Sequence, residues 1–579
     1  MSTQRPETPP APSATPSPTR RLFPSSDRFI PKPERVFVNR NLRFSQILAI
    51  GFDLDHTLAH YDALPIEKLA FELTKKKLVE KRGYPAEVLR FKYDPDFVVR
   101  GLVVDRQLGN CLKMDYFRYV GRACHGLSRL DSTERARLYN EKPPRYSGDR
   151  FVSVDTLFHL PEVHLYLLLI DWLEKSGKTP DYSALYQDVR DMIDEAHRDG
   201  TLKSVITRNV GNFVRRNPQV PVVLDEFRRA GKRLFLLTNS EWSYSAALLR
   251  HLLEARRGER SWERFFDLII VDSKKPAFFM DGPAIRTPTS IESETGVPSF
   301  SGGNAAFLEA HLGIGGDQIL YFGDHTYGDI LRSKKSLGWR TAMIVPEVRK
   351  EVAVTQSLTR QYAAFERLAH EHDQIELEKA ALGREWRKLS LALSGEDGQD
   401  ADALQILKLY DPRAAAGAAG ASSPAGAPVK AGAAGSGGGP DNGDGNGAGN
   451  GGPVPSSELP LRLKALVDGS GSGPGGRRTR GDRRRTARLR ELELLAQRIA
   501  DLDHRASSLA GRIRSLRRQV DQAYNATWGS VFREGSEASR FGHQLKDFAC
   551  VYTGEVSNFL HYPWNYYFQS PMNVMPHDL

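Results

Sequence analysis

The chain has 579 residues, which is enough for two or three compact units, and 40% of them are hydrophobic, with no apolar run long enough to cross a membrane. Three widely spaced cysteines, Cys111, Cys124 and Cys550, exclude a disulfide framework, and no apolar signal core is seen, so we expect a cytoplasmic location. The formal net charge of +10 is concentrated near Arg477–Arg490 and does not characterise the whole chain.

The first strong element is the apolar run Ile47–Phe52, which follows a Pro/Ser/Thr-rich stretch, residues 1–30, that we predict to be a disordered tail. Asp53 and Asp55 come directly after the run. A short apolar run before a polar turn is typical of a buried strand in an α/β sheet, and ligands bind at the carboxyl ends of such strands. Two carboxylates there suit a Mg²⁺-assisted phosphoryl transfer, although strand-end caps and other metal loops carry the same pattern.

A long insertion follows this first strand. About 180 residues separate Asp55 from the next strong strand, too many for a simple connection, so residues 61–229 are predicted to form a largely helical cap domain. Within it, the run Val163–Leu173 is a strongly apolar helix, and Tyr186–His197 is an amphipathic one.

The polar face of this second helix has two interpretations. Arg190, Asp194 and His197 share one face beside the core stripe, and Lys203 follows the helix stop at Gly200. The face is either an exposed ladder of ion pairs or the wall of a cleft.

Four further strands alternate with helical stretches. This alternation predicts a parallel, doubly wound α/β sheet built from residues 31–60 and 230–350. The predicted strands are Arg233–Ser240, Phe266–Asp272, Ile319–Asp324 and Thr341–Val345.

Polar groups at the strand ends form an ordered set. After the two acids come Thr238, then Lys275 before a proline, then Asp324 with Asp329. The order of these groups resembles the motif order of the haloacid dehalogenase (HAD) superfamily of phosphatases. In both, an acid pair, a hydroxyl, a lysine and a second acid pair each follow an apolar strand. This resemblance also implies the Rossmann-like sheet with an inserted cap.

The resemblance implies a role for each strand-end residue. Asp53 would be the nucleophile that forms an aspartyl-phosphate, and Asp55 the general acid and base. Mg²⁺ would be held by Asp53, Asp324 and Asp55, the last through its carbonyl, with Asp329 as a ligand or next to one. The phosphate would be bound by Thr238, Asn239, Ser240 and Lys275.

Longer segments look like the cytosolic purine 5′-nucleotidases that prefer IMP and GMP. They are Gly51–Leu58, Leu236–Ser240, Val271–Phe279 and Gly323–Lys335, and the aromatic C-terminus is also similar. The family stacks the purine on an aromatic ring, which implies Phe158. The resemblance assigns base and sugar contacts, and therefore a cleft, to His159, Arg190, Asp194, His197 and Lys203.

Two positions depart from that family. His159 stands where the family typically has Asn, which leaves the base preference open. The family's adenine-nucleotide effector pocket maps to Tyr327 and Lys335, but Asp155 replaces an Asn nearby, so regulation by ATP is also open. A homo-oligomer is expected, and a covalent intermediate makes phosphate transfer to a nucleoside a natural second activity.

The C-terminal third is different in character. Residues 355–395 and 486–525 carry apolar side chains three and four apart, which predicts a coiled-coil-like pair, either an antiparallel hairpin or a dimer seam. The Gly/Ala/Pro-rich residues 396–485 between them are predicted to be a linker with a basic end. We favour a solvated linker over a nucleic-acid-binding arm. Residues 526–579 are expected to pack on the core.

Three functions remain open. The first is a Mg²⁺-dependent 5′-nucleotidase acting on purine nucleoside monophosphates. The second is a HAD phosphatase for another phosphorylated metabolite. The third is a non-catalytic coiled-coil scaffold with a basic arm, which is disfavoured because every catalytic position is filled.

Overall fold

The computed structural model describes residues 30–145, 148–254, 261–280, 286–393, 409–410, 455–469 and 480–571. The chain divides into two compact units. The first unit comprises Met1–Thr355 and Tyr524–Leu579, and the second comprises Gln356–Ala523.

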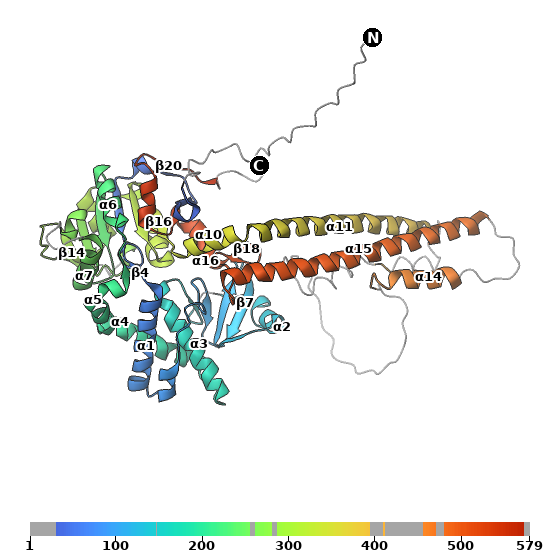
Figure 1. Cartoon of the computed structure of the whole chain (residues 1–579), viewed down its shortest axis with the longest axis horizontal. Coiled ribbons are helices and arrows are strands. Elements are labelled where there is room, and N and C mark those ends of the chain that lie inside the picture. The colour runs from blue at the N-terminus through green and yellow to red at the C-terminus, as the bar shows by residue number, and fades with distance from the viewer. Residues whose placement is uncertain are drawn as a thin grey trace, which may run out of the picture. The chain divides into compact units, whose positions relative to one another are not determined.

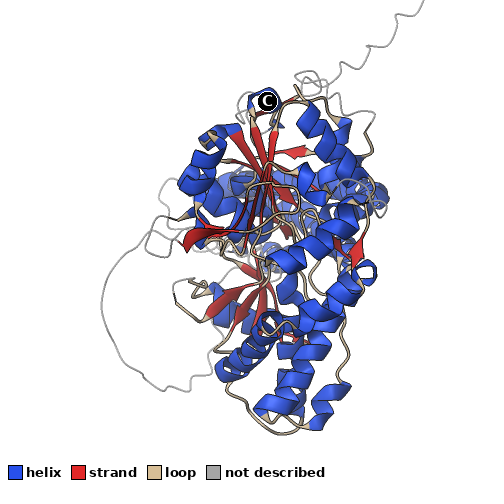
Figure 2. Cartoon of the chain, turned by 90° about the vertical axis from the view of Figure 1, so that its left-hand side faces the viewer, coloured by secondary structure: helices blue, strands red, loops and turns tan. Residues whose placement is uncertain are grey.

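A nine-stranded sheet forms the centre of the first unit, in the order β1-β19-β16-β15-β3-β11-β12-β14-β13 (Figure 2). The strands from β19 to β14 pair in parallel, and the two edge strands, β1 and β13, pair antiparallel. The bounds are β1 Phe37–Val38, β3 Ala49–Phe52, β11 Arg233–Leu237, β12 Leu268–Val271, β13 Arg286–Ser290, β14 Ser299–Gly303, β15 Ile319–Gly323, β16 Arg340–Ile344 and β19 Val551–Thr553.

Helices cover both faces of this sheet because its central strands are apolar on both sides. In β3, Ile50 and Phe52 belong to one buried cluster and Ala49 to another. Helices α6 (Gln219–Arg229) and α7 (Trp242–Leu253) contribute to the first cluster, and α8 (Ala305–Leu312) to the second. The predicted doubly wound, parallel α/β sheet is therefore confirmed.

The end of the chain completes the sheet. Strand β19 lies parallel to β16, so a segment far along the sequence supplies one of the parallel strands. Phe559 and Phe568 then pack against Phe44, with ring centroids 5.8 and 6.2 Å apart. These contacts make residues 551–568 part of the core.

The described part of the inserted segment after β3 holds a second sheet and, before α6, four helices of eight or more residues. The helices are α1 (Ala63–Arg82), α3 (Leu160–Lys175), α4 (Tyr182–Arg198) and α5 (Thr201–Arg208). The sheet is antiparallel, in the order β8-β7-β6-β5-β9. Its strands are β5 Val103–Asp105, β6 Asn110–Met114, β7 Val120–His125, β8 Ser128–Arg129 and β9 Phe151–Ser153.

The largely helical prediction omitted this second sheet. Its strands are short, and the buried positions include Lys113 and Arg122, which conceal the apolar pattern. Lys113 is buried because its ammonium group donates to the carbonyls of Trp528 and Arg533, at 2.6 and 2.7 Å. Such contacts with distant backbone cannot be deduced from local sequence.

Helix α1 carries a buried acid whose charge state couples folding to pH. Glu67 is 7% exposed and accepts a hydrogen bond from the Tyr93 hydroxyl at 2.9 Å. Burial is the main cause that raises the pKa of Glu67 to about 7, and the Tyr93 hydrogen bond opposes it. The folded chain therefore binds this proton more tightly than the unfolded chain, so this contribution to stability is full below about pH 4.5 and is lost as pH rises to about 7.

Glu67→Gln, which mimics the protonated acid, should raise the free energy of unfolding at pH 8 by about 2 kcal/mol and change it little at about pH 4, where both the folded and the unfolded chain hold the proton. Urea denaturation at the two pH values measures this. Glu80→Gln, on the exposed side of the same helix, is the control and should show no such dependence. Equal stability of wild type and Glu67→Gln at pH 8 would contradict the prediction.

The second unit is built on two long helices, α11 (Thr359–Leu393) and α15 (Arg480–Tyr524) (Figure 1). They run antiparallel within one chain, since Glu378 pairs with Arg498 at 2.7 Å while Glu371 pairs with Arg505 further along. Trp386, Leu492 and Ile499 are buried between elements of this unit. Of the two predicted arrangements, these contacts correspond to the antiparallel hairpin.

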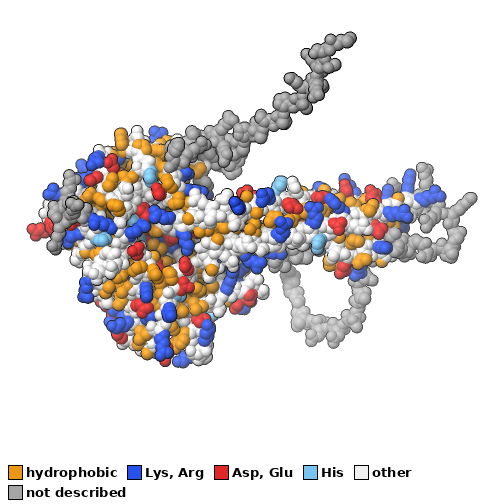
Figure 3. Space-filling model, in the orientation of Figure 1, with side chains coloured by type: hydrophobic (Ala, Val, Ile, Leu, Met, Phe, Trp, Pro, Cys, Tyr) orange, Lys and Arg blue, Asp and Glu red, His pale blue; other side chains and the backbone are white. Residues whose placement is uncertain are grey.

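Part of the predicted linker is instead a packed helix. Residues Leu459–Gly469 form α14, and Leu459 and Leu463 are fully buried because apolar residues recur four apart. Most of the remaining predicted linker, and nearly all of the predicted tail, lie outside the described residues. Arginines outnumber acids along α15, and Figure 3 shows basic side chains on the surface of this helical pair. In the parts of the chain that the structure describes, every helix is too short or too polar to span a bilayer.

Candidate active site

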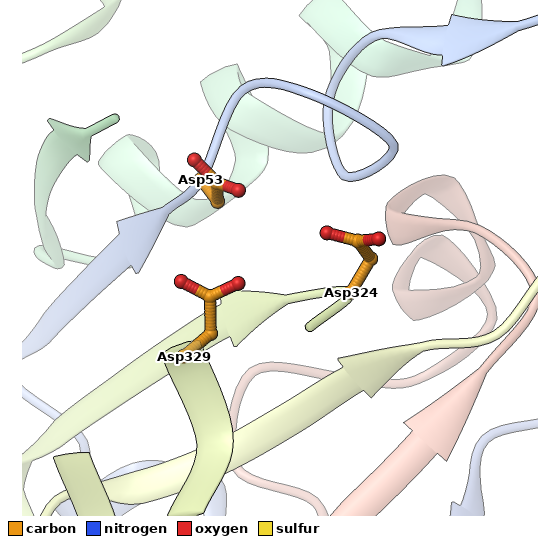
Figure 4. Close-up of side chains that lie close together, drawn as sticks. All are labelled: Asp53, Asp324 and Asp329. Carbon is orange, nitrogen blue, oxygen red and sulfur yellow. The ribbon is translucent and has the colours of Figure 1, made fainter. Parts of the chain in front are cut away.

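Three buried carboxylates meet beyond the ends of the central strands (Figure 4). Asp53 follows β3, Asp324 follows β15, and Asp329 lies in the short helix η12 (Thr326–Leu331). One oxygen from each carboxylate lies within 4.8 Å of the other two. The parallel pairing of β3 with β15 brings these residues together, because their carboxyl ends share one edge of the sheet.

Gly323 allows this close approach. A Cβ atom on Gly323 would lie 2.5 Å from Cβ of Asp329, well inside van der Waals contact. Any side chain at this position would push Asp329 away from the other two acids.

Lys275 occupies the space between two of the carboxylates. Its Nζ lies 2.8 Å from Asp53 Oδ1 and 2.7 Å from Asp329 Oδ1, and it donates to the Tyr321 hydroxyl at 2.8 Å. Burial lowers the pKa of Lys275, but Asp329 and Asp53 outweigh burial and raise that pKa above its usual value. The ammonium group is therefore held in the charged form.

The acids themselves are costly to ionise in this site. Burial raises the pKa of Asp53 to about 7, against the opposing effect of Lys275. Burial, together with the neighbouring Asp329, also raises the pKa of Asp324 well above its usual range. A nearby cation would lower both of these raised pKa values.

The donor set fits a hard divalent cation. Oδ2 of Asp324 is buried and has no hydrogen-bond partner among the described residues. Clustered carboxylate oxygens are the ligands that Mg²⁺ prefers, and a buried unpaired oxygen is explained by an ion that it would bind. Asp53, Asp324 and Asp329 could therefore hold such a cation.

The Asp55 side chain lies outside this cluster. Its Oδ1 accepts a hydrogen bond from Tyr61 at 2.5 Å, and its Oδ2 accepts one from Ser240 at 2.7 Å. The Tyr61 hydroxyl is in turn 2.7 Å from that of Tyr244. Two hydroxyls thus orient the carboxylate, and neither Tyr61 nor Tyr244 was predicted from the sequence.

The residues after β11 connect two loops of the site. Thr238 Oγ1 accepts from the Ser240 amide at 3.1 Å, which stabilises the turn. Asn239 accepts from the Lys275 amide at 2.6 Å and donates to the Lys275 carbonyl at 3.0 Å. The Asn239 side chain therefore positions the backbone of Lys275.

A cavity of about 470 Å³ adjoins these loops. Its lining includes Asp55, Asn239 and Ser240 from the sheet side. It also includes all of the cap residues singled out from sequence: Phe158, His159, Arg190, Asp194, His197 and Lys203. The polar face of α4 is therefore a cavity wall rather than an exposed ladder.

Arg190 is the centre of the polar part of that wall. Its guanidinium donates to Glu162 at 2.8 Å, to Asp194 at 3.1 Å and to Nε2 of His159 at 2.8 Å. Burial lowers the pKa of His159, consistent with a neutral ring that accepts from Arg190. Glu162, which was not predicted as a site residue, is buried and anchors this cluster.

Aromatic and cationic groups form the rest of the wall. The Phe158 ring is 4.6 Å from His56 and 5.8 Å from His197, in edge-to-face arrangements. Lys203 pairs with Glu241, and its Nζ lies 5.0 Å from the ring centroid of Tyr244. The cavity wall thus combines aromatic rings with charged groups.

The predicted effector residues lie elsewhere. Tyr327 is 39% exposed and stacks under Arg332, whereas the Nζ of Lys335 lies 5.3 Å from the Phe548 ring. Neither lines the 470 Å³ cavity. Asp155 pairs with Arg540 at 3.2 Å.

The chain is similar to known proteins to different extents. The chain is 31% identical over 365 residues to 5′-nucleotidase domain-containing protein 2 of Rattus norvegicus, covering 59% of this chain and 64% of the relative. The human protein of the same name is 30% identical and is covered to 68%. The chain thus spans about two thirds of the length of these relatives.

Solved structures show weaker similarity. A predicted phosphoglycolate phosphatase from Haemophilus somnus is 15% identical, with a TM-score of 0.25, and the match covers 52% of this chain and 86% of that one. An archaeal β-phosphoglucomutase from a Pyrococcus strain is 14% identical, with the same TM-score, and covers 51% and 86%.

The match to a family model is the most extensive. It covers residues 36–408 and 478–579, which include all three carboxylates, Lys275 and the cavity wall. The chain therefore belongs to the 5′-nucleotidase family.

Proposed function

We propose that the chain is a Mg²⁺-dependent phosphohydrolase that releases phosphate from purine nucleoside 5′-monophosphates through an aspartyl-phosphate on Asp53. The observation that carries the proposal is the position of the Asp53–Lys275–Asp329 cluster next to the cavity. Asp55, Asn239 and Ser240 line that cavity and also contact or adjoin the cluster. Family membership supports a nucleotide as the substrate.

Each residue of the site has a separate role in the proposed reaction. Lys275 reduces the repulsion between the Asp53 carboxylate and an incoming phosphate, so Asp53 attacks phosphorus and the ester oxygen leaves. Asp55 gives a proton to that oxygen and then takes one from the water that hydrolyses the aspartyl-phosphate. Thr238 and the amides after it hold the phosphate oxygens. Bound Mg²⁺ would neutralise phosphate charge as a Lewis acid.

The cavity supports recognition of the nucleoside. Its volume falls within the range of small-ligand sites, and Phe158 supplies an aromatic surface for a base. Arg190, Asp194, His197 and Lys203 would bind the base and ribose. We propose IMP and GMP as the preferred substrates on the resemblance of these positions to the purine-specific family.

A covalent intermediate also suggests a second outcome. Water and a nucleoside hydroxyl can each attack the aspartyl-phosphate, so phosphate transfer to a nucleoside is proposed as a side activity. An adenine-nucleotide effector near Tyr327 and Lys335, and a homo-oligomeric state, remain predictions from the resemblance.

Phosphate release from a panel of substrates tests the proposal. Purine and pyrimidine monophosphates, sugar phosphates and phosphoglycolate would be compared with Mg²⁺, with EDTA, and with Mg²⁺ plus ATP. We expect IMP and GMP to be hydrolysed fastest and EDTA to abolish the activity until Mg²⁺ is restored. Faster hydrolysis of a sugar phosphate would favour a HAD phosphatase for another metabolite. The absence of turnover with every ester would favour a non-catalytic scaffold.

A further inference from the structure

Arg100 connects the inserted cap segment to the loop that carries Asp324. Its side chain is completely buried, and Nη1 donates to the backbone carbonyl of Asp324 at 2.9 Å. Nε and Nη2 donate to the two carboxylate oxygens of Glu347 at 2.9 and 2.6 Å. The guanidinium also lies over the Phe541 ring, 4.8 Å from its centroid.

The Asp324 carbonyl lies beyond the hydrogen-bonded part of the sheet. The pairing of β15 with β16 ends at Gly323 opposite Met343, so the ladder does not hold the next residue in place. Arg100 supplies a donor at that point, from a turn more than two hundred residues earlier in the chain. We infer that Arg100 is a positioning residue, which holds the backbone of Asp324 so that its carboxylate faces Asp53 and Asp329.

Only the planar fork of arginine satisfies this arrangement. Two of its donors are aligned by the Glu347 carboxylate, which leaves Nη1 directed at the Asp324 carbonyl. Glu347 begins helix α10 (Glu347–Ser357), so the fork is held by a regular element. The adjacent Gly101, at φ 91°, lets the chain approach Phe541, because a Cβ there would lie 2.5 Å from the Phe541 Cβ. A lysine carries all its donors on one nitrogen and therefore cannot reproduce this spread of hydrogen bonds to Glu347 and Asp324.

Metal binding by the protein alone tests this role, which rests on the proposed metal site. Binding of Mn²⁺ without substrate would be followed by electron paramagnetic resonance in wild type and Arg100→Lys. We expect the Kd for Mn²⁺ to rise about 10- to 100-fold in Arg100→Lys, as is usual when the support of a metal ligand is removed. The KM for nucleotide should stay unchanged while kcat falls, because the cavity wall is intact.

Arg150→Lys is the matched control. Arg150 makes the same fork with Asp105, at 2.9 and 2.7 Å, and lies 4.8 Å from the Phe151 ring, but its partners lie in the cap sheet. This control should leave the Kd for Mn²⁺ unchanged. A raised Kd of similar size in Arg150→Lys would overturn the inference, because any loss of cap stability would then produce the effect.

Two further outcomes separate the inference from the proposed function. If wild type does not bind Mn²⁺, the metal site and the proposed function both fail. If wild type binds and Arg100→Lys binds equally well, the inference alone fails. Should Arg100→Lys not fold, Glu347→Gln keeps Arg100 but removes the charge that aligns it, and an unchanged Kd in that variant overturns the inference.

Discussion

Asp53→Asn is expected to lower phosphate release from IMP or GMP by at least about a thousandfold, because an amide cannot form the aspartyl-phosphate. Wild type would be incubated with a nucleotide labelled in its phosphate group and quenched in acid. The protein should then retain a label that hydroxylamine removes, and Asp53→Asn should retain none. The variant is nearly isosteric, so the pocket keeps its shape.

Loss of folding should not account for this effect. Burial raises the pKa of Asp53 to about 7, so the charged form lowers the stability of the metal-free chain above that pH, and a neutral amide removes this cost. The free energy of unfolding of Asp53→Asn at pH 8 should therefore be no lower than that of wild type. Asp317→Asn, an exposed position before β15, is the control for activity. Substantial turnover by Asp53→Asn would exclude Asp53 as the nucleophile.

Lys275→Met should damage both activity and stability. The ammonium group that Asp53 and Asp329 share is lost, and two buried carboxylates are left close together. We expect kcat/KM to fall at least about a hundredfold and the free energy of unfolding to fall by about 3 kcal/mol. Steady-state kinetics and urea denaturation measure the two effects.

A double variant separates these contributions. Asp329→Asn added to Lys275→Met removes one of the two facing charges, so it should recover most of the stability but none of the activity. Lys350→Met, at an exposed lysine, should change neither. If Lys275→Met loses stability while the folded fraction keeps its full activity, Lys275 has a structural role only.

The strand-end residues were predictable because two local signals coincide there. Apolar runs marked β3, β11, β12 and β15, and polar residues stood directly after them. Parallel pairing alone then brings Asp53 and Asp324 to one edge. Strand β14, which lies between β12 and the edge strand β13, has the sequence Ser-Phe-Ser-Gly-Gly, contains no apolar run and gave no such signal.

The cap was harder to predict for a different reason. Helical periodicity placed Arg190, Asp194 and His197 on one face but could not say what that face meets. The resemblance to a known family supplied the cavity, and the structure brings the same side chains to its wall. Glu162 is hidden in an apolar helix, where a single acid has no recognisable pattern.

Contacts between distant segments account for most of what was missed. Arg100 pairs with Glu347, and Tyr61 approaches Tyr244, over separations of 247 and 183 residues. A single sequence does not reveal such partners, because none of these four residues belongs to a motif. The supports of the site are thus less predictable than the groups they orient.

The chain leaves the first unit after Thr355 and re-enters it at Tyr524. The hydroxyls of these two residues are 2.9 Å apart. The two ends therefore form a closed junction, whose geometry does not depend on how much chain lies between them. The entropic cost of closing a longer loop grows only with the logarithm of its length. Insertions and deletions within Gln356–Ala523 should therefore leave the first unit, and the phosphate chemistry proposed for it, unchanged.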